Sequence, residues 1–154
     1  MEERTENSSK GKYFIMLADD DPDDRELFEE AAQLLEPKIR IEMVKDGVEL
    51  MDYLNTSSNI PDTIFLDLNM PKKNGKECLQ EIAANNELKN IPIIIYTTSL
   101  NPVDVDDTYK CGARYFFRKP NSFDELMEVL AKAFRLVLEA SPSKGRDTYI
   151  LNES

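Results

Sequence analysis

The chain has 154 residues, of which 30 are acidic and 19 are basic, so its formal charge is −11. This length suits one domain. The acidity argues against binding to nucleic acid or to an anionic membrane surface, because both partners are themselves negatively charged. The sequence contains no histidine, which excludes histidine-based catalytic triads and histidine metal sites. Its two cysteines, Cys78 and Cys111, form no motif, so a reducing, cytoplasmic location is expected.

Polar segments stand at both ends of the chain. Residues 1–11 contain no apolar core segment and are expected to form an N-terminal tail. Residues 141–154 are polar as well, contain Pro142 and Gly145, and are expected to form a C-terminal tail. Residues 12–140 are then the folded domain. No apolar run in the chain approaches the length of a membrane span.

Short apolar runs alternate with stretches of helical periodicity through the central region. In chain order, the apolar runs predict five strands, at residues 13–18, 39–43, 63–68, 91–96 and 115–117. A helix is predicted after each strand, and the five helices begin near residues 22, 47, 75, 102 and 123. Capping residues mark these starts, as at Asp21 directly before Pro22.

The alternation of strands and helices predicts an α/β fold in which a parallel sheet is covered on both faces. At this size we expect the flavodoxin-like, doubly wound arrangement, with five strands in the order 2-1-3-4-5 and five helices. Ligands of such folds bind beyond the carboxyl ends of the strands. The residues that follow each predicted strand are therefore the candidates for function.

Charged and hydroxyl side chains stand at the ends of four predicted strands. These residues are, in chain order, Asp19 and Asp20, then Asp67, then Thr97, and finally Lys119. Because these strand ends are neighbours in the predicted order, the side chains should meet at one edge of the sheet. Clustered carboxylates without histidine or cysteine favour a hard cation, Mg²⁺ or Mn²⁺. A carboxylate beside such a cation and a lysine could attack phosphorus and form an acyl phosphate.

Each of these signals alone has an ordinary structural explanation. Aspartates before a helix usually act only as caps, and a hydroxyl run after a strand is often turn chemistry. A lysine followed by proline commonly starts a loop. Their coincidence at four neighbouring strand ends is what favours a functional site.

Four segments carry a resemblance to a known family: 18–20 (Ala-Asp-Asp), 65–71 with Gly75 after it, 96–98 (Tyr-Thr-Thr) and 117–120 (Phe-Arg-Lys-Pro). Through them, residues 12–140 resemble a stand-alone receiver domain of bacterial two-component response regulators, with the CheY-like fold. The resemblance implies that a histidine kinase or phosphotransfer protein supplies a phosphoryl group, and that the domain then signals through changed protein contacts. It names neither the kinase nor the downstream target, and it leaves open whether the domain forms a homodimer.

The resemblance also implies a role for each candidate residue. The roles are phosphoryl transfer for Asp67, Lys119 and Thr97, metal binding for Asp19, Asp20, Asp67 and Asn69, and switching for Thr97 and Phe116. Asp67 is the implied phosphoacceptor. Within the metal site, Asp20 is expected to contact the cation more directly than Asp19, and Asn69 contributes its backbone carbonyl.

Two other functions are compatible with parts of this pattern. A phosphohydrolase with an aspartate nucleophile also uses Mg²⁺, but it needs a second aspartate two residues further on, where this chain has Asn69. A degenerate receiver would bind partners without accepting phosphate, although every residue for phosphorylation is present here. We therefore expect a phosphoacceptor, and not an enzyme that turns over a small substrate.

Overall fold

The computed structural model describes residues 13–98, 100–138 and 145–152. The N-terminal tail expected at residues 1–11 lies outside these ranges. In chain order, the elements are β1 (Phe14–Ala18), α2 (Pro22–Leu35), β2 (Arg40–Val44), α3 (Gly47–Thr56), β3 (Thr63–Leu66), α4 (Gly75–Ala83), β4 (Ile93–Thr97), α5 (Pro102–Lys110), β5 (Tyr115–Arg118), α6 (Phe123–Leu138), a short 3-10 helix (Arg146–Thr148) and β6 (Ile150–Asn152). The five predicted strands and five predicted helices are all present, and each strand end lies within two residues of its predicted position.

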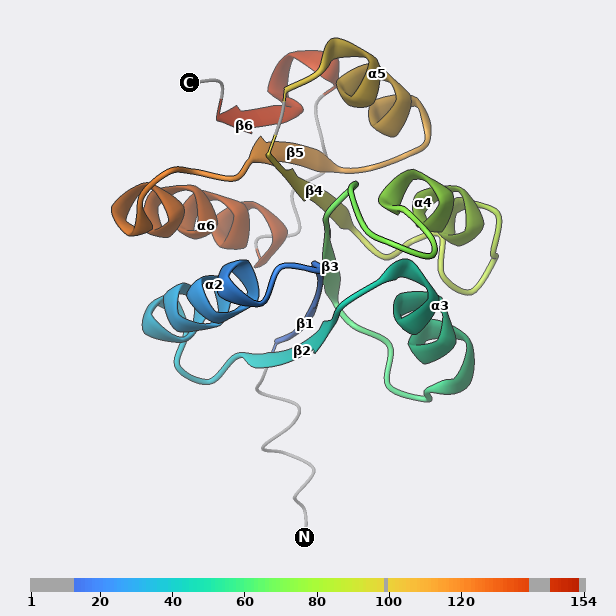
Figure 1. Ribbon diagram of the computed structural model, residues 1–154, viewed down its shortest axis with the longest axis horizontal. Helices are drawn as coiled ribbons and strands as arrows, with labels where there is room; N and C mark the ends of the chain where they lie inside the picture. The colour runs from blue at the N-terminus through green and yellow to red at the C-terminus, as the bar shows by residue number, and fades with distance from the viewer. Residues whose placement is uncertain (1–12, 99, 139–144, 153–154) are drawn as a thin grey trace, which may run out of the picture.

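The strands form one parallel sheet between two layers of helices (Figure 1). Helices α2 and α6 cover one face of the sheet, and α3, α4 and α5 cover the other. The side chains of β1, β3 and β4 are buried throughout, as expected for strands with a helical layer on each side. The predicted α/β class and the 2-1-3-4-5 order of the first five strands are confirmed.

The five-stranded sheet predicted from the sequence is wrong by one strand. Within the described residues the sheet has six strands, in the order β2-β1-β3-β4-β5-β6, and β6 lies at its edge beside β5. Residues 145–152, which their polar composition predicted to lie in a C-terminal tail, form the 3-10 helix and this strand. Helix α6 therefore connects two parallel strands, so the βα alternation continues beyond the point where the polar composition suggested that it stopped.

Buried packing attaches the last segment to the domain. Tyr149 has no exposed surface, and its ring centroid lies 5.9 Å from that of Phe116 and 5.2 Å from that of Tyr109. Its hydroxyl lies 2.6 Å from Thr108 Oγ1, and its carbonyl accepts a hydrogen bond from the Phe116 N–H at 2.9 Å. At the other end of β6, the Asn152 side chain pairs with the backbone of Arg118. The buried ring of Tyr149 and the side-chain amide of Asn152 therefore hold β6 in place. The segment does not contain the longer apolar run by which a strand is usually recognised in a sequence.

None of the helices in the described ranges combines the length and the apolar character that crossing a membrane requires.

Candidate functional site

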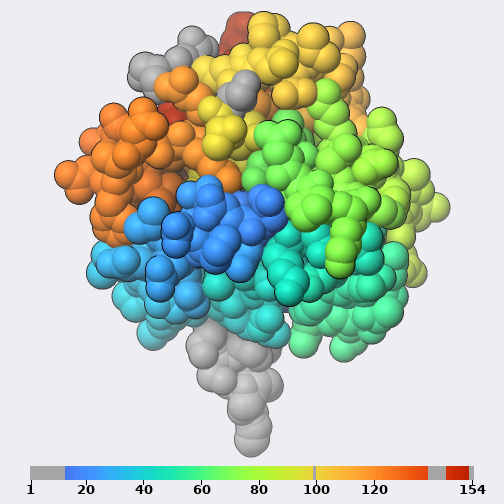
Figure 2. Space-filling model, in the orientation of Figure 1, coloured from blue at the N-terminus to red at the C-terminus, as the bar shows by residue number. Residues whose placement is uncertain are grey.

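The carboxyl ends of β1, β3 and β5 bring three of the predicted residues together. Asp67 N–H donates to the carbonyl of Ala18 at 3.0 Å, and Lys119 N–H donates to the carbonyl of Thr97 at 2.6 Å. These backbone bonds extend the sheet ladder by one step past the strand ends, so the site residues keep the register of the sheet. Figure 2 looks onto this edge, where the blue start of α2 borders the green segment that leads into α4.

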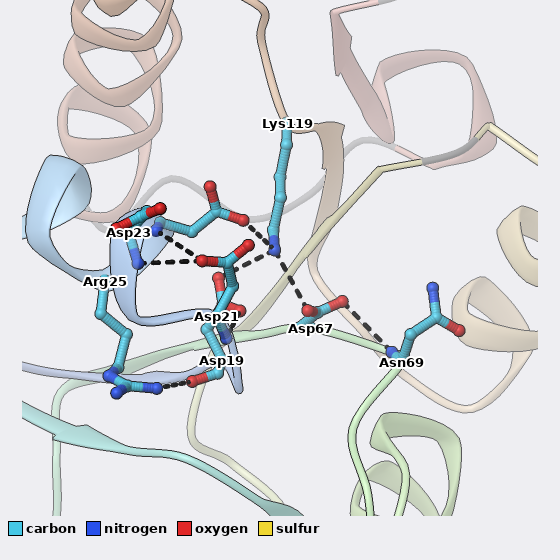
Figure 3. A network of polar contacts seen from close by, with 8 residues as sticks. Asp19, Asp21, Asp23, Arg25, Asp67, Asn69 and Lys119 are labelled. Atoms are coloured by element: carbon cyan, nitrogen blue, oxygen red, sulfur yellow. Dashed lines mark hydrogen bonds and ion pairs between the residues drawn. The ribbon is translucent and has the colours of Figure 1, made fainter.

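Lys119 lies at the centre of the site (Figure 3). Its Nζ is 2.9 Å from Asp19 Oδ2, 2.9 Å from Asp24 Oδ2 and 3.1 Å from Asp67 Oδ2. Hydrogen-bond geometry is met toward Asp24 and Asp67, whereas the contact with Asp19 is an ion pair by distance alone. Burial acts to lower the pKa of Lys119, but its hydrogen bonds and the charges of the aspartates outweigh burial and raise that pKa above its ordinary value. The lysine is therefore a fixed cation.

Three carboxylates make a candidate metal centre. One carboxylate oxygen from each of Asp19, Asp20 and Asp67 lies within 4.8 Å of the others. Asp19 Oδ2 is buried and has no hydrogen-bond partner among the described residues. Burial raises the pKa of Asp19 to about 6, although Lys119 and the N–H of Asp21 act in the opposite direction. Three clustered carboxylates share a single ammonium here, and a divalent cation would neutralise the remaining negative charge, so the residues fit a metal.

The third consecutive aspartate has a different task. Asp21 Oδ1 accepts hydrogen bonds from the N–H groups of Asp23 at 2.9 Å and Asp24 at 3.3 Å, so Asp21 caps α2. This cap fixes the first turn of the helix against the end of β1, where the Asp21 N–H also donates to Asp19 Oδ1 at 3.0 Å. Capping, rather than metal binding, is therefore the role that the geometry gives to Asp21.

Asp20 is expected to bind the metal and Asp21 caps α2, so mutations of these neighbouring residues should have different effects. Asp20→Ala should weaken binding of Mg²⁺ by at least about tenfold, the loss expected even for an indirect metal partner. Asp21→Ala should keep most of that affinity and instead lower the free energy of unfolding by about 1 kcal/mol, because a helix cap is lost. Calorimetric titration with Mg²⁺ and urea denaturation measure the two quantities. If Asp21→Ala has the larger effect on the affinity, the metal ligands are misassigned.

The loop after β3 holds the Asp67 carboxylate from the other side. The N–H of Asn69 donates to Asp67 Oδ1 at 3.2 Å. Gly75, the first residue of α4, packs so closely that a Cβ there would lie 2.3 Å from the Asp67 carbonyl oxygen. A side chain at this position would push α4 away from the end of β3. The spacing from Asp67 to Gly75 therefore reflects a close approach that positions Asp67.

The two predicted switch residues lie on neighbouring strands. Thr97 ends β4 and is almost fully buried, and Phe116 on β5 has no exposed surface. Phe116 pairs in register with Ile95, two residues before Thr97. The outer side of Phe116 is covered by Tyr149, so the chain itself occupies part of the surface beside β5 that was open in the predicted five-stranded sheet.

One residue of the site was missed in the sequence analysis. Asp24 lies three residues after the cap, so one helical turn brings its carboxylate back toward the sheet edge and onto Lys119. The feature of the sequence that could have identified Asp24 is its position three residues after the helix cap, in a first turn rich in acidic residues. Helical periodicity alone could not separate Asp24 from its exposed neighbour Asp23.

The chain is similar to known proteins over most of its length. The family model described as the response regulator receiver domain matches residues 15–131. Response regulator Rcp1 of Synechocystis sp. is 32% identical over 121 residues, which are 75% of this chain and 82% of Rcp1.

Two solved structures share the fold over nearly their whole length. The phosphorylated cyanobacterial phytochrome response regulator RcpA superposes with a TM-score of 0.79 at 29% identity, covering 87% of this chain and 99% of RcpA. The Mn²⁺-bound form of Rcp1 superposes with a TM-score of 0.77 at 30% identity, covering 86% of this chain and 99% of that one.

Proposed function

The chain belongs to the response regulator receiver family, and we propose that Asp67 is the residue at which it accepts a phosphoryl group. Receiver domains take this group from a histidine kinase or a phosphotransfer protein. The observation that carries the assignment is the Lys119 ammonium, which donates to Asp67 Oδ2 at 3.1 Å beside the carboxylates of Asp19 and Asp20. A nucleophile, a cation and a metal-binding cluster are thus within reach of one another.

The transfer needs only positioning and charge stabilisation from the chain. A carboxylate oxygen of Asp67 forms a bond to phosphorus while the bond from phosphorus to the donor histidine nitrogen breaks, and that nitrogen keeps the electron pair. The Asn69 N–H and the Lys119 ammonium fix the two oxygens of Asp67 before the transfer. Lys119 and the hydroxyl of Thr97 then bind oxygens of the new phosphoryl group.

A divalent cation would be held by Asp19, Asp20, Asp67 and the backbone carbonyl of Asn69. This donor set contains only oxygen, which favours Mg²⁺ or Mn²⁺ over softer metals. The close approach of the Asp19, Asp20 and Asp67 carboxylates, within 4.8 Å of one another, supports this proposal. When bound, the cation neutralises charge that develops on the transferring group.

Thr97 and Phe116 are the proposed route from Asp67 to the surface. Movement of the Thr97 hydroxyl toward the phosphoryl group would leave space that the Phe116 ring can enter. Because Tyr149 packs on that ring, the strand β6 is part of the surface that would respond, along with α5. The domain then signals through changed protein contacts, with a second copy of the chain among the candidate partners.

A phosphohydrolase with an aspartate nucleophile would need a second acidic group, and the sequence has no acid at that position. Asn69 occupies the position two residues after Asp67, and its amide cannot transfer the proton that a general acid must supply. We therefore propose a phosphoacceptor that promotes its own phosphorylation and does not turn over a small substrate.

Acceptor labelling tests the proposal. Incubation with acetyl phosphate and Mg²⁺ should add the mass of one phosphoryl group, and peptide mapping should place it at Asp67. Asp67→Asn should abolish the added mass, because an amide cannot form the acyl phosphate. Asp52→Asn removes an exposed carboxylate on α3 and should be labelled like the unmodified chain. A chain that folds, binds Mg²⁺ and remains unlabelled would instead be a receiver that acts only by binding.

A further inference from the structure

Lys119 donates a hydrogen bond to a carboxylate that the phosphoacceptor role does not use. Asp24 Oδ2, from the first turn of α2, lies 2.9 Å from Lys119 Nζ, closer than Asp67 Oδ2 at 3.1 Å. The lysine therefore joins α2 to the acceptor residue. Its ammonium has three N–H donors. Two hydrogen bonds are formed, one to Asp24 and one to Asp67.

The three aspartates around Lys119 differ in exposure. The Asp19 side chain has no exposed surface and that of Asp67 has 5%, whereas that of Asp24 has 30%. Asp24 is therefore the most solvent-exposed of the three carboxylates, and a phosphoryl donor must approach the site from solvent. A carboxylate in this place holds the lysine and also adds a negative charge next to an incoming anion.

We propose that Asp24 is a positioning residue that competes with the phosphoryl group for Lys119. This inference rests on the proposed role of Asp67. Before transfer, Asp24 and Asp67 share the ammonium, and the hydrogen bond to Asp24 fixes it beside α2. After transfer, phosphoryl oxygens need the same donors, so the lysine must weaken its bond to Asp24. The carboxylate thereby limits how tightly the site holds the phosphoryl group.

Replacing Asp24 with asparagine removes the charge and keeps the shape of the side chain. The Lys119 ammonium then loses the charged carboxylate of Asp24 as a hydrogen-bond partner. A phosphoryl group that enters the site also meets one negative charge fewer. When solvent screens it, as at a partly exposed site, a unit charge a few ångströms away corresponds to about a three- to tenfold change in affinity. We therefore expect Asp24→Asn to bind beryllofluoride, a mimic of the phosphoryl group on Asp67, about three- to tenfold more tightly in the presence of Mg²⁺.

Asp23 offers a matched control on the same helical turn. Asp23 is exposed, and within the described residues its side chain forms no hydrogen bond or ion pair with Lys119. Only its backbone N–H takes part in the cap. Asp23→Asn removes the same charge from the same turn, so it should change beryllofluoride affinity less than about twofold. Asp24→Glu keeps the charge and should remain close to the unmodified chain. Titrations followed by fluorine and amide NMR measure all four affinities.

A second measurement reads the proposed contact directly. The ¹⁵N resonance of the Lys119 ammonium in the phosphoryl-free protein should shift in Asp24→Asn and stay in place in Asp23→Asn. Equal affinities and equal lysine resonances in the two asparagine variants would overturn the proposal, as would weaker binding by Asp24→Asn. If neither the unmodified chain nor any variant binds beryllofluoride, the phosphoacceptor role fails. If the unmodified chain binds it and Asp24→Asn matches Asp23→Asn, only this inference fails.

Discussion

Lys119→Met is expected to lower the free energy of unfolding of the metal-free domain by about 3–5 kcal/mol at neutral pH, the usual cost of removing one partner from a buried ion pair. Methionine keeps the length of the side chain and removes its charge. Asp19 and Asp67 are almost fully buried, and without the ammonium their charges would face each other without compensation. The ammonium also lies over the Tyr96 ring, 5.1 Å from its centroid.

An exposed lysine supplies the control. Lys110 makes an ion pair with Asp106 one turn away on α5, and its side chain is 72% exposed, so Lys110→Met should leave stability nearly unchanged. Urea denaturation compares the two variants. Millimolar Mg²⁺ should raise the stability of Lys119→Met more than that of the unmodified chain, because a cation then compensates the same carboxylates. If the two variants unfold at the same urea concentration, the ammonium does not stabilise the buried cluster.

Much of the fold follows from patterns within single segments. Buried strands of a parallel sheet are short and apolar on both sides, so β1, β3 and β4 are visible as apolar runs. Capping residues place the helix starts, as with Asp21 and Asn74, whose side chains accept hydrogen bonds from the first turns of α2 and α4. The strand order then follows from the topology of such folds. The predicted meeting of Asp19, Asp67 and Lys119 depends only on that order.

Features that depend on contacts between distant segments were not predictable in the same way. The strand β6 has three residues, and its partner β5 lies more than thirty positions earlier in the chain. The Asp24 contact likewise joins residues 95 positions apart. A pattern of three residues or one aspartate carries too little information to identify such a partner. The site residues on strand ends were predictable because topology, not individual contacts, brings them together.

Tyr149→Ala is the second large change, with an expected loss of about 3–5 kcal/mol in the free energy of unfolding, as for other buried aromatic side chains. Its ring fills the space between Phe116 and Tyr109 and has no exposed surface. Tyr149→Phe should cost only about 1 kcal/mol, because it keeps the ring and removes one hydroxyl. The Thr108 hydroxyl then still donates to the carbonyl of Asp104 at 2.8 Å.

Urea denaturation of both variants separates the packing of the ring from the hydrogen bond of its hydroxyl. Nearly equal stability of Tyr149→Ala and the unmodified chain would mean that β6 does not dock on β5 in solution. The expected loss would instead show that the sixth strand belongs to the folded domain. Any movement of Phe116 must then also displace a buried ring of the C-terminal segment, because Tyr149 packs directly on it. The edge strand would therefore be mechanically connected to the site at Asp67 through Phe116 and Thr97.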